Sequence, residues 1–205
     1  DPAGNLSQFK DRKNQVTTLS YDALNRRIGA SYADGSTTSF TYDAVGRLAV
    51  AEDSGSGKIE FSYDTLDRLI QEITSLGTVH YQYDALGRRT SMTANGQQAV
   101  EYQYDAASRL IQVAQAGLVV GLSYDAVGRR TSLTYPNGTN TTYSYDFSSR
   151  LTTILHQGPA GVIESLSYTY DAAGNRISLT RANGTSSLLP VAVQSAYDAA
   201  NEKIQ

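Results

Sequence analysis

The sequence contains no cysteine and no tryptophan, and it has only one methionine and four prolines. The lack of cysteine excludes disulfide bonds, thiolate metal sites and a cysteine nucleophile. It leaves the compartment open, because bacterial exported chains and cytosolic chains both occur without cysteine. Leu, Ile, Val and Phe together number 43 of the 205 residues, which is little aliphatic mass for packing helices onto a sheet.

Basic residues are not in excess either. The 17 Lys and Arg residues are outnumbered by 20 Asp and Glu residues, for a net charge of −3. This balance argues against a nucleic-acid-binding surface, which is normally basic. Long apolar runs are also missing, so the sequence predicts no membrane-spanning segment. The opening residues 1–5 do not have the pattern of a signal peptide.

The abundant residues, which include Ser, Thr, Gly and Tyr, form a repeat. The dipeptide Tyr-Asp occurs nine times at intervals of 20 to 27 residues, beginning at Tyr21, Tyr42, Tyr63, Tyr83, Tyr104, Tyr124, Tyr145, Tyr170 and Tyr197. Residues 1–5 match residues 171–175, so the chain opens inside a further copy. We expect residues 1–205 to be a single array of about ten repeats and a fragment of a longer protein.

Each copy follows the pattern aromatic-x-Tyr-Asp-x-x-Gly-Arg. In three clear copies the motif residues are Tyr42, Asp43, Gly46 and Arg47; Tyr83, Asp84, Gly87 and Arg88; and Tyr124, Asp125, Gly128 and Arg129. Asp at the first and Gly at the fourth position is the chemistry of a type I turn, in which the carboxylate accepts an N–H two residues on. Gly, Asn or Asp at the fourth position tolerates a positive φ, which predicts a hairpin loop with a β-bulge.

A second turn signal lies between successive Tyr-Asp motifs. It is Asp34-Gly35, Gly55-Ser56-Gly57, Leu76-Gly77, Asn95-Gly96, Ala116-Gly117, Asn137-Gly138, Gly158-Pro159-Ala160-Gly161 and Asn183-Gly184. Two turns per copy leave strands of roughly 7 residues, about 23 Å long. Ring pairs such as Tyr81 and Tyr83 are two residues apart and share one face of the strand, while His80 points to the other.

This pattern predicts an all-β fold of antiparallel strand-turn-strand repeats of about 20–21 residues. Because open twisted sheets seldom exceed about ten strands, a meander of about 18 or 19 strands must curl as a shell, spiral or wide hollow barrel. No segment has the amphipathic pattern of a helix that could cover this sheet. We expect a single-layer wall with a Tyr ladder on one face and polar residues on the other.

The repeat unit resembles the YD repeat of the RHS (rearrangement hotspot) family. The closest copies are Tyr124-Asp125-Ala126-Val127-Gly128-Arg129 and Tyr170-Asp171-Ala172-Ala173-Gly174-Asn175-Arg176, and the likeness covers nearly the whole chain. RHS proteins are large bacterial polymorphic toxins related to cocoon-forming components of ABC toxin complexes and to teneurins. The resemblance implies a hollow shell of β-hairpins around a C-terminal toxic domain, in a secreted or cell-surface bacterial protein. The autoproteolytic core that follows the repeats in this family is not recognisable in this sequence.

The motif residues are interpreted as structural, because a catalytic residue is needed once whereas Asp and Arg recur in every wall copy. The expected role of the Arg is to stack on a Tyr or to pair with a neighbouring Asp. His80 and His156, the only histidines, lack metal-ligand spacing, and no nucleophile elbow or phosphate loop is present. We therefore expect no catalytic residues, no metal and no cofactor.

Residues 151–205 depart from the regular period. The last two intervals are lengthened by additions around Gly158 to Gly161 and Ser186 to Val191, and Asn175 and Glu202 stand where the motif has Arg. The apolar residues 188–193 are a candidate contact surface for the rest of the parent protein.

Three functions remain open. The leading hypothesis is a non-catalytic shell segment whose partners are the remainder of the parent RHS protein and its toxin payload. The alternatives are a surface module that recognises a glycan or a cell-surface protein through exposed Tyr, and self-association through unpaired strand edges.

Overall fold

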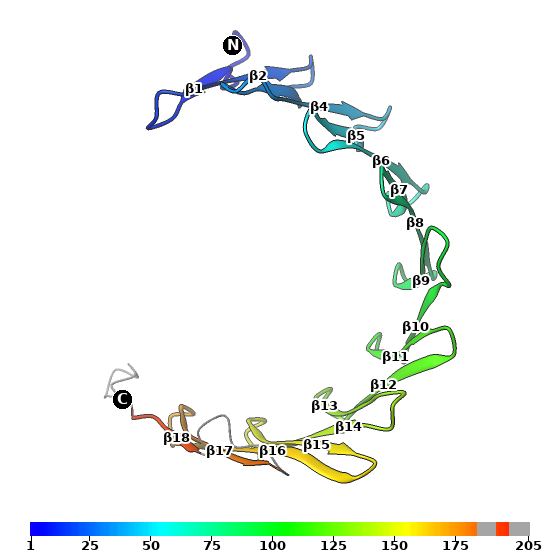
Figure 1. Cartoon of the computed structure of the whole chain (residues 1–205), viewed down its shortest axis with the longest axis vertical. Coiled ribbons are helices and arrows are strands. Elements are labelled where there is room, and N and C mark those ends of the chain that lie inside the picture. The colour runs from blue at the N-terminus through cyan, green and yellow to red at the C-terminus, as the bar shows by residue number, and fades with distance from the viewer. Residues whose placement is uncertain (184–191, 197–205) are drawn as a thin grey trace. The chain divides into compact units, whose positions relative to one another are not determined.

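The computed structural model describes residues 1–183 and 192–196, and every regular element in them is a β-strand. Eighteen strands follow one another along these residues (Figure 1). The prediction of an all-β fold of antiparallel strand-turn-strand repeats is confirmed. Within the same residues there is no helix long and apolar enough to cross a membrane.

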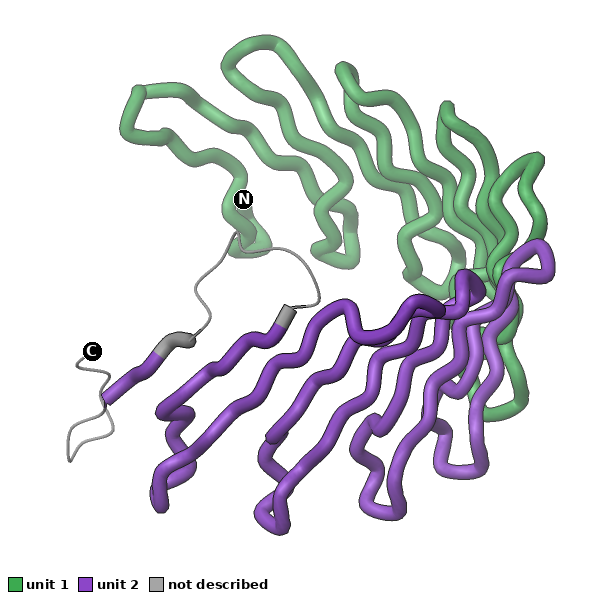
Figure 2. The backbone as a smooth tube through the Cα atoms, turned by 60° about the horizontal axis from the view of Figure 1, so that its bottom comes forward, with its two compact units in different colours: residues 1–100 green, residues 101–205 purple. Residues whose placement is uncertain are grey.

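The strands fall into two compact units, residues 1–100 and 101–205 (Figure 2). The first unit holds β1 (Gln8–Lys10), β2 (Val16–Tyr21), β3 (Arg27–Ser31), β4 (Thr37–Tyr42), β5 (Leu48–Asp53), β6 (Gly57–Tyr63), β7 (Leu69–Thr74), β8 (Gly77–Tyr83) and β9 (Arg89–Ala94). β10 (Val100–Tyr104) begins at the last residue of this unit. The second unit continues with β11 (Leu110–Gln115), β12 (Leu118–Tyr124), β13 (Arg130–Thr134), β14 (Asn140–Tyr145), β15 (Leu151–Gly158), β16 (Gly161–Tyr170), β17 (Arg176–Asn183) and β18 (Ala192–Gln194).

Each unit is a meander in which a strand pairs antiparallel with the next strand along the chain. This holds from β1 to β9 and again from β11 to β18. The register shifts by one residue at the motif Tyr: Thr41 pairs with Val50, but Tyr42 pairs with Leu48. The predicted β-bulge is thus confirmed, and it increases the local twist of the sheet.

The turn after each Tyr-Asp pair has the predicted backbone conformation. Its fourth residue has a positive φ in every described copy, with Gly46 at 92° and Asp67 at 63°. The other members are Gly4, Asn25, Gly87, Ser108, Gly128, Ser149 and Gly174. Residues 1–5 form the same turn, with Gly4 at the left-handed position, whereas Asn201 lies outside the described residues.

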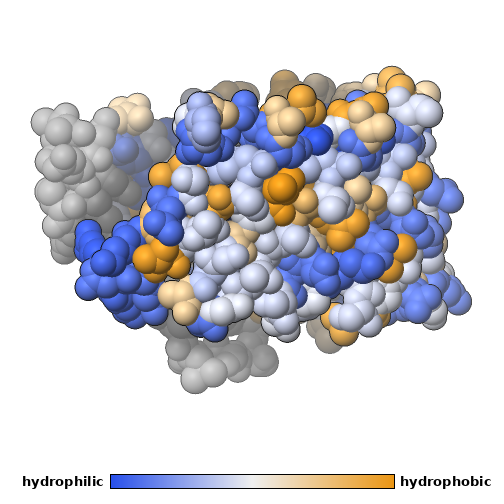
Figure 3. All heavy atoms as spheres, turned by 90° about the horizontal axis from the view of Figure 1, so that it is seen from above, coloured by the Kyte–Doolittle hydropathy of each residue, from blue (hydrophilic) through white to orange (hydrophobic). Residues whose placement is uncertain are grey.

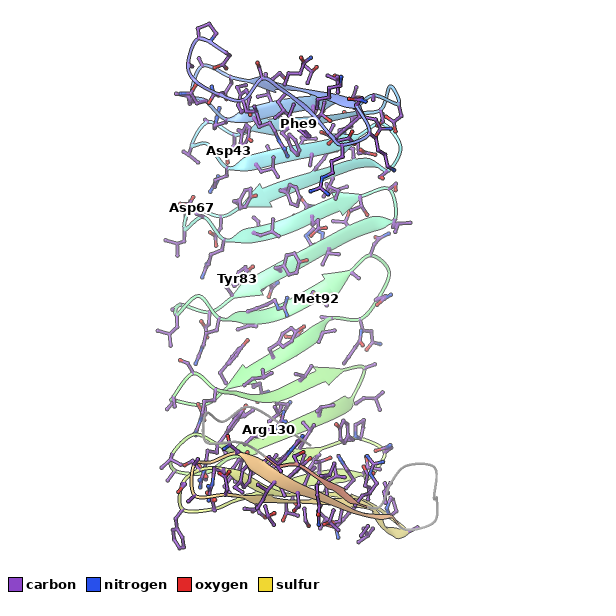
Figure 4. The ribbon with its side chains drawn as sticks, turned by 90° about the vertical axis from the view of Figure 1, so that its left-hand side faces the viewer. Phe9, Asp43, Asp67, Tyr83, Met92 and Arg130 are labelled. Atoms are coloured by element: carbon purple, nitrogen blue, oxygen red, sulfur yellow. The ribbon has the colours of Figure 1, made fainter. Side chains whose placement is uncertain are left out.

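The turns at the other end of the strands follow the second signal. Gly35, Gly57, Gly77, Gly96, Gly117, Gly138 and Gly161 all have positive φ. Sequence reasoning missed one further turn of this kind, from Asp11 to Gln15, in which Asn14 has a φ of 64°. In the first unit the turns that carry Asp43 and Asp67 lie along the same edge of the sheet (Figure 4).

The described residues form almost no buried core, because in each unit they make up one sheet with no second described layer packed on it. Among the described residues only Gly29, Ala30, Ser91 and Thr141 are buried, and no large side chain is fully buried. In β4 the side chains alternate, with Phe40 and Tyr42 half-buried and Ser39 and Thr41 exposed. His80 is likewise exposed between its half-buried neighbours, as predicted. Hydrophobic residues are scattered among hydrophilic ones on the face seen in Figure 3.

Of the two additions that lengthen the C-terminal copies, only the first lies within the described residues. The first addition extends the hairpin of β15 and β16, which have 8 and 10 residues and a register shift between His156 and Gln157. The second addition, the apolar residues 188–191 and the last Tyr-Asp pair lie outside the described residues.

The left-handed turn position provides a direct test of this fold. Replacing Gly46 by Val is expected to cost about 1 kcal/mol or more, because a β-branched residue is strained at positive φ. A Cβ there would also meet Nη1 of Arg26 at 3.3 Å. Urea unfolding should show a lower midpoint for Gly46→Val and a nearly unchanged one for Gly46→Asn, since Asn tolerates this conformation. Equal midpoints for wild type and Gly46→Val would contradict the turn geometry.

Candidate functional site

The Tyr-Asp motif builds a turn around one carboxylate. The N–H of Gly46 donates to the carbonyl oxygen of Asp43 at 3.0 Å, and the N–H of Asp43 donates to the carbonyl oxygen of Arg47 at 2.8 Å. Oδ1 of Asp43 accepts the N–H groups of Val45 and Arg47 at 3.0 and 2.9 Å. The Asp43 side chain therefore stabilises the same turn as the Asp43 backbone, as the sequence predicts.

The motif Arg pairs with the Asp of its own turn. Nε of Arg47 donates to Oδ2 of Asp43 at 2.6 Å, and the Arg47 side chain is only 27% exposed to solvent. Pairs at 2.6 or 2.7 Å recur as Asp22–Arg26, Asp43–Arg47, Asp64–Arg68, Asp84–Arg88, Asp105–Arg109, Asp125–Arg129 and Asp146–Arg150. With one carboxylate oxygen bound to the backbone and the other to Nε, the guanidinium is held in one orientation.

The oriented guanidinium reaches into the next repeat. Its Cζ lies 4.7 Å from the ring centroid of Tyr63, and Nη1 donates to the carbonyl oxygen of Asp64 at 3.0 Å. In return, the hydroxyl of Tyr63 donates to the carbonyl oxygen of Leu48, the residue after Arg47, at 2.9 Å. We name this arrangement the clasp: the Arg–Asp pair of one turn, and the Tyr ring, Tyr hydroxyl and Asp carbonyl of the next.

The clasp recurs within both units. The stacked pairs, with Cζ 4.4 to 4.9 Å from the ring centroid, are Arg26–Tyr42, Arg47–Tyr63, Arg68–Tyr83, Arg109–Tyr124, Arg129–Tyr145 and Arg150–Tyr170. The hydroxyls of these tyrosines donate at 2.7 to 2.9 Å to the carbonyls of Arg27, Leu48, Leu69, Leu110, Arg130 and Leu151. Within each unit, these repeats are thus joined to their neighbours by side chains as well as by the strand ladder.

At three positions where the left-handed residue is not glycine, its side chain bonds to a side chain of the preceding repeat. Nη1 of Arg47 donates to Oδ1 of Asp67 at 2.6 Å, and Nη1 of Arg129 donates to the hydroxyl of Ser149 at 3.1 Å. In the first copy, Nδ2 of Asn5 donates to Oδ1 of Asn25 at 2.8 Å. Sequence reasoning missed this contact, although every non-glycine residue at the position is polar.

The electrostatics of the turn favour the ionised carboxylate. The hydrogen bond from the backbone N–H of Arg68 lowers the pKa of Asp64 below its usual value of 3.8, and the side-chain hydrogen bond of Arg68 lowers it further, against a partial desolvation that raises it. Asp22, Asp105 and Asp146 have lowered pKa values for the same leading reason.

The structure places the twelve predicted motif residues in three turns, two of them in the first unit. Tyr42 and Tyr83 are stacked by Arg26 and Arg68, and Tyr83 is labelled beside its turn edge in Figure 4. Arg88 pairs with Asp84 at 2.7 Å, and Arg129 with Asp125 at 2.7 Å. The Asp that pairs with the motif Arg in each of these turns is the one in the same turn, and Arg47 pairs in addition with Asp67 of the next repeat.

The described residues hold no group of three or more His, Asp or Glu side chains that could bind a metal ion. The two histidines lie far apart in sequence: His80 is exposed on β8, and Nδ1 of His156 on β15 lies 2.8 Å from the hydroxyl of the buried Thr141.

A one-layer sheet of hairpins, tied repeat to repeat through Tyr, Asp and Arg, defines a YD-repeat β-shell protein. The family model described as Teneurin YD-shell matches residues 3–140, and the model described as RHS Repeat matches residues 124–163. The chain therefore belongs to the teneurin YD-shell family, as the resemblance to RHS repeats predicted. No curated protein matches the chain.

Solved structures show the same fold. A TcdB2–TccC3–Cdc42 crystal structure is similar with a TM-score of 0.63 and 18% identity over 98% of this chain and 13% of that chain. The Photorhabdus luminescens Tc holotoxin pore is similar with a TM-score of 0.62 and 17% identity over the same shares of the two chains. The chain thus spans about an eighth of the proteins it resembles in structure.

The lowered carboxyl pKa values predict how stability depends on pH. A depressed pKa in the folded state contributes stability above the unfolded value of 3.8, and this contribution is lost as the pH falls through the folded value. Asp64→Asn should therefore be less stable than wild type at pH 7. The difference in the free energy of unfolding between the two proteins should become smaller as the pH falls from 5 to 3. Urea unfolding at each pH measures this difference. The control is the turn-tip variant Val45→Ala, whose difference from wild type should stay constant with pH. A gap for Asp64→Asn that does not change with pH would contradict the assignment.

Proposed function

We propose that this chain is a non-catalytic wall segment of a shell that encloses or supports a payload domain lying outside the chain. The shell would belong to a secreted or cell-surface bacterial protein, and the partners of the segment would be the remainder of that protein and its payload. The observation that carries the proposal is the clasp, which uses the recurring Tyr, Asp and Arg of the motif to join neighbouring repeats.

The chemistry of the wall supports a structural role. The polar side chains that could otherwise serve as acids or nucleophiles recur with the repeat and are engaged in it: the motif carboxylate accepts two N–H groups and pairs with Arg. A sheet that buries so few of its own side chains encloses space better than it packs a core. The likeness of its fold to TcdB2–TccC3 structures and to a Tc holotoxin pore supports the proposal.

Protease protection in the longer protein tests this function. The payload should resist added trypsin while the wall is intact, because the wall keeps the protease from it. The double variant Arg47→Ala, Arg68→Ala removes two successive clasps in the first unit and should make the payload digest several times faster. Val45→Ala, at an exposed turn tip outside the clasp, should leave protection unchanged.

The decisive contrary result is a payload that is digested in the intact wild-type protein as fast as the isolated payload. A payload that stays protected when both clasps are removed, in a variant whose repeats have unfolded by circular dichroism, would also contradict enclosure by this wall.

A further inference from the structure

Asparagine is followed by glycine three times in the chain, at Asn95-Gly96, Asn137-Gly138 and Asn183-Gly184. The third pair extends beyond the described residues, and the other two lie in exposed turns, one in each unit. An Asn-Gly pair is open to an intramolecular reaction, in which the backbone nitrogen of the glycine attacks the side-chain amide of the asparagine. Glycine favours this attack because it has no side chain to block the approach.

In the turn that holds Asn137, both groups needed for this reaction are engaged. The N–H of Gly138, which contains the attacking nitrogen, donates to the carbonyl oxygen of Tyr135 at 3.1 Å. The side-chain oxygen of Asn137 accepts the hydroxyl and the N–H of Thr139 at 2.7 and 3.0 Å. Gly138 is the fourth residue of this turn, so the hydrogen bond that closes the turn also holds the glycine nitrogen.

The turn that holds Asn95 places the same dipeptide one position earlier. The N–H of Gln97 donates to the carbonyl oxygen of Ala94 at 3.0 Å, so Gly96 is the third residue of the turn. Its φ of 72° is that of a type II turn. Among the described residues, neither the N–H of Gly96 nor the side-chain amide of Asn95 has a hydrogen-bond partner. The attacking nitrogen and the amide that it attacks are therefore both free.

The one backbone hydrogen bond at Asn95 does not oppose the reaction. The N–H of Asn95 donates to the carbonyl oxygen of Thr78 at 2.8 Å. This nitrogen is not part of the ring that forms, which contains the Gly96 nitrogen and the C, Cα, Cβ and Cγ atoms of Asn95. Both Asn95 and Asn137 are exposed, so access of water does not distinguish the two sites. The difference between them lies in their hydrogen bonds.

We propose that Asn95 is a site of spontaneous deamidation in the folded protein, whereas the fold protects Asn137. This inference goes beyond the wall function and does not depend on it. Hydroxide removes the proton of the Gly96 N–H, and the nitrogen attacks Cγ of Asn95. The N–Cγ bond forms as the Cγ–Nδ2 bond breaks, and Nδ2 takes a proton from water and leaves as ammonia, which regenerates hydroxide. One water then opens the cyclic imide at either carbonyl, and nothing is oxidised or reduced.

Either product of the hydrolysis changes the turn. Aspartate and isoaspartate both bring a negative charge to a position that was neutral. Isoaspartate also inserts the Cβ atom of residue 95 into the main chain, within the segment that the hydrogen bond from Gln97 to Ala94 closes. The modification therefore accumulates with the age of the protein at one turn of the first unit, while the turn at Asn137 keeps its structure.

Peptide mapping by mass spectrometry tests the proposal, after the folded chain has been incubated at pH 8. Trypsin releases Asn95 in residues 90–109 and Asn137 in residues 131–150, so one sample reports both sites through the mass gained when OH replaces NH2. In the folded chain Asn95 should convert about tenfold faster than Asn137 or more, because reaction at Asn137 first requires its hydrogen bonds to break. In the chain unfolded by urea the two rates should be similar, since both residues precede glycine.

Two variants assign the effect to the named groups. Asn95→Gln keeps the amide but requires a larger ring, so conversion in residues 90–109 should disappear. Thr139→Val removes one hydrogen bond to the Asn137 side chain and should raise the rate at Asn137 severalfold, with the rate at Asn95 unchanged.

Equal rates at Asn95 and Asn137 in the folded chain would overturn the proposal. So would an Asn95 that stays intact in the folded chain while it converts in urea, or conversion of residues 90–109 that persists in Asn95→Gln.

Discussion

A sheet one layer thick cannot bury its side chains against a second layer, so its cohesion has to come from contacts within the layer. The clasp of Arg, Asp and Tyr is the interaction that meets this constraint. Arg47 is held by the carboxylate of its own turn and laid over Tyr63 of the next repeat, and the hydroxyl of Tyr63 returns a hydrogen bond to the backbone beside Arg47. The turn and the joint between repeats therefore depend on the same guanidinium.

Each part of the clasp contributes modestly. An exposed cation–π contact is worth about 0.5–1 kcal/mol, a hydrogen bond a net of about 0.5–1.5, and a half-exposed ion pair no more than about 1. The wall gains its stability from recurrence, since in a repeat protein the contacts between neighbours add along the chain. This explains a composition that is poor in aliphatic residues and rich in Tyr: the rings serve as the flat partners of arginines rather than as the filling of a core.

Much of the fold is readable from the residues because it is decided locally. Asp43 and Gly46 specify their turn through hydrogen bonds between residues at most four apart in the sequence. The positive φ at Asn25 and Gly46 follows from residue type. The direction of the clasp is different. Nothing in the spacing of Arg47 tells whether it pairs with Asp43 or with an Asp across the ladder, because that depends on the bulge, the twist and the reach of the side chain. The contact to Asp67 likewise arises from the three-dimensional juxtaposition of neighbouring repeats.

The central claim is that Arg47 and Tyr63 join neighbouring repeats through direct contact, and a double-mutant cycle measures it most directly. The free energies of unfolding of Arg47→Lys, Tyr63→Leu and the double variant give the coupling energy, with Arg47→Lys and Tyr81→Leu as a pair outside any shared clasp. The account predicts a coupling of about 0.5 kcal/mol or more for Arg47 with Tyr63 and additivity within about 0.5 kcal/mol for the control pair. Additivity of Arg47→Lys and Tyr63→Leu would contradict it.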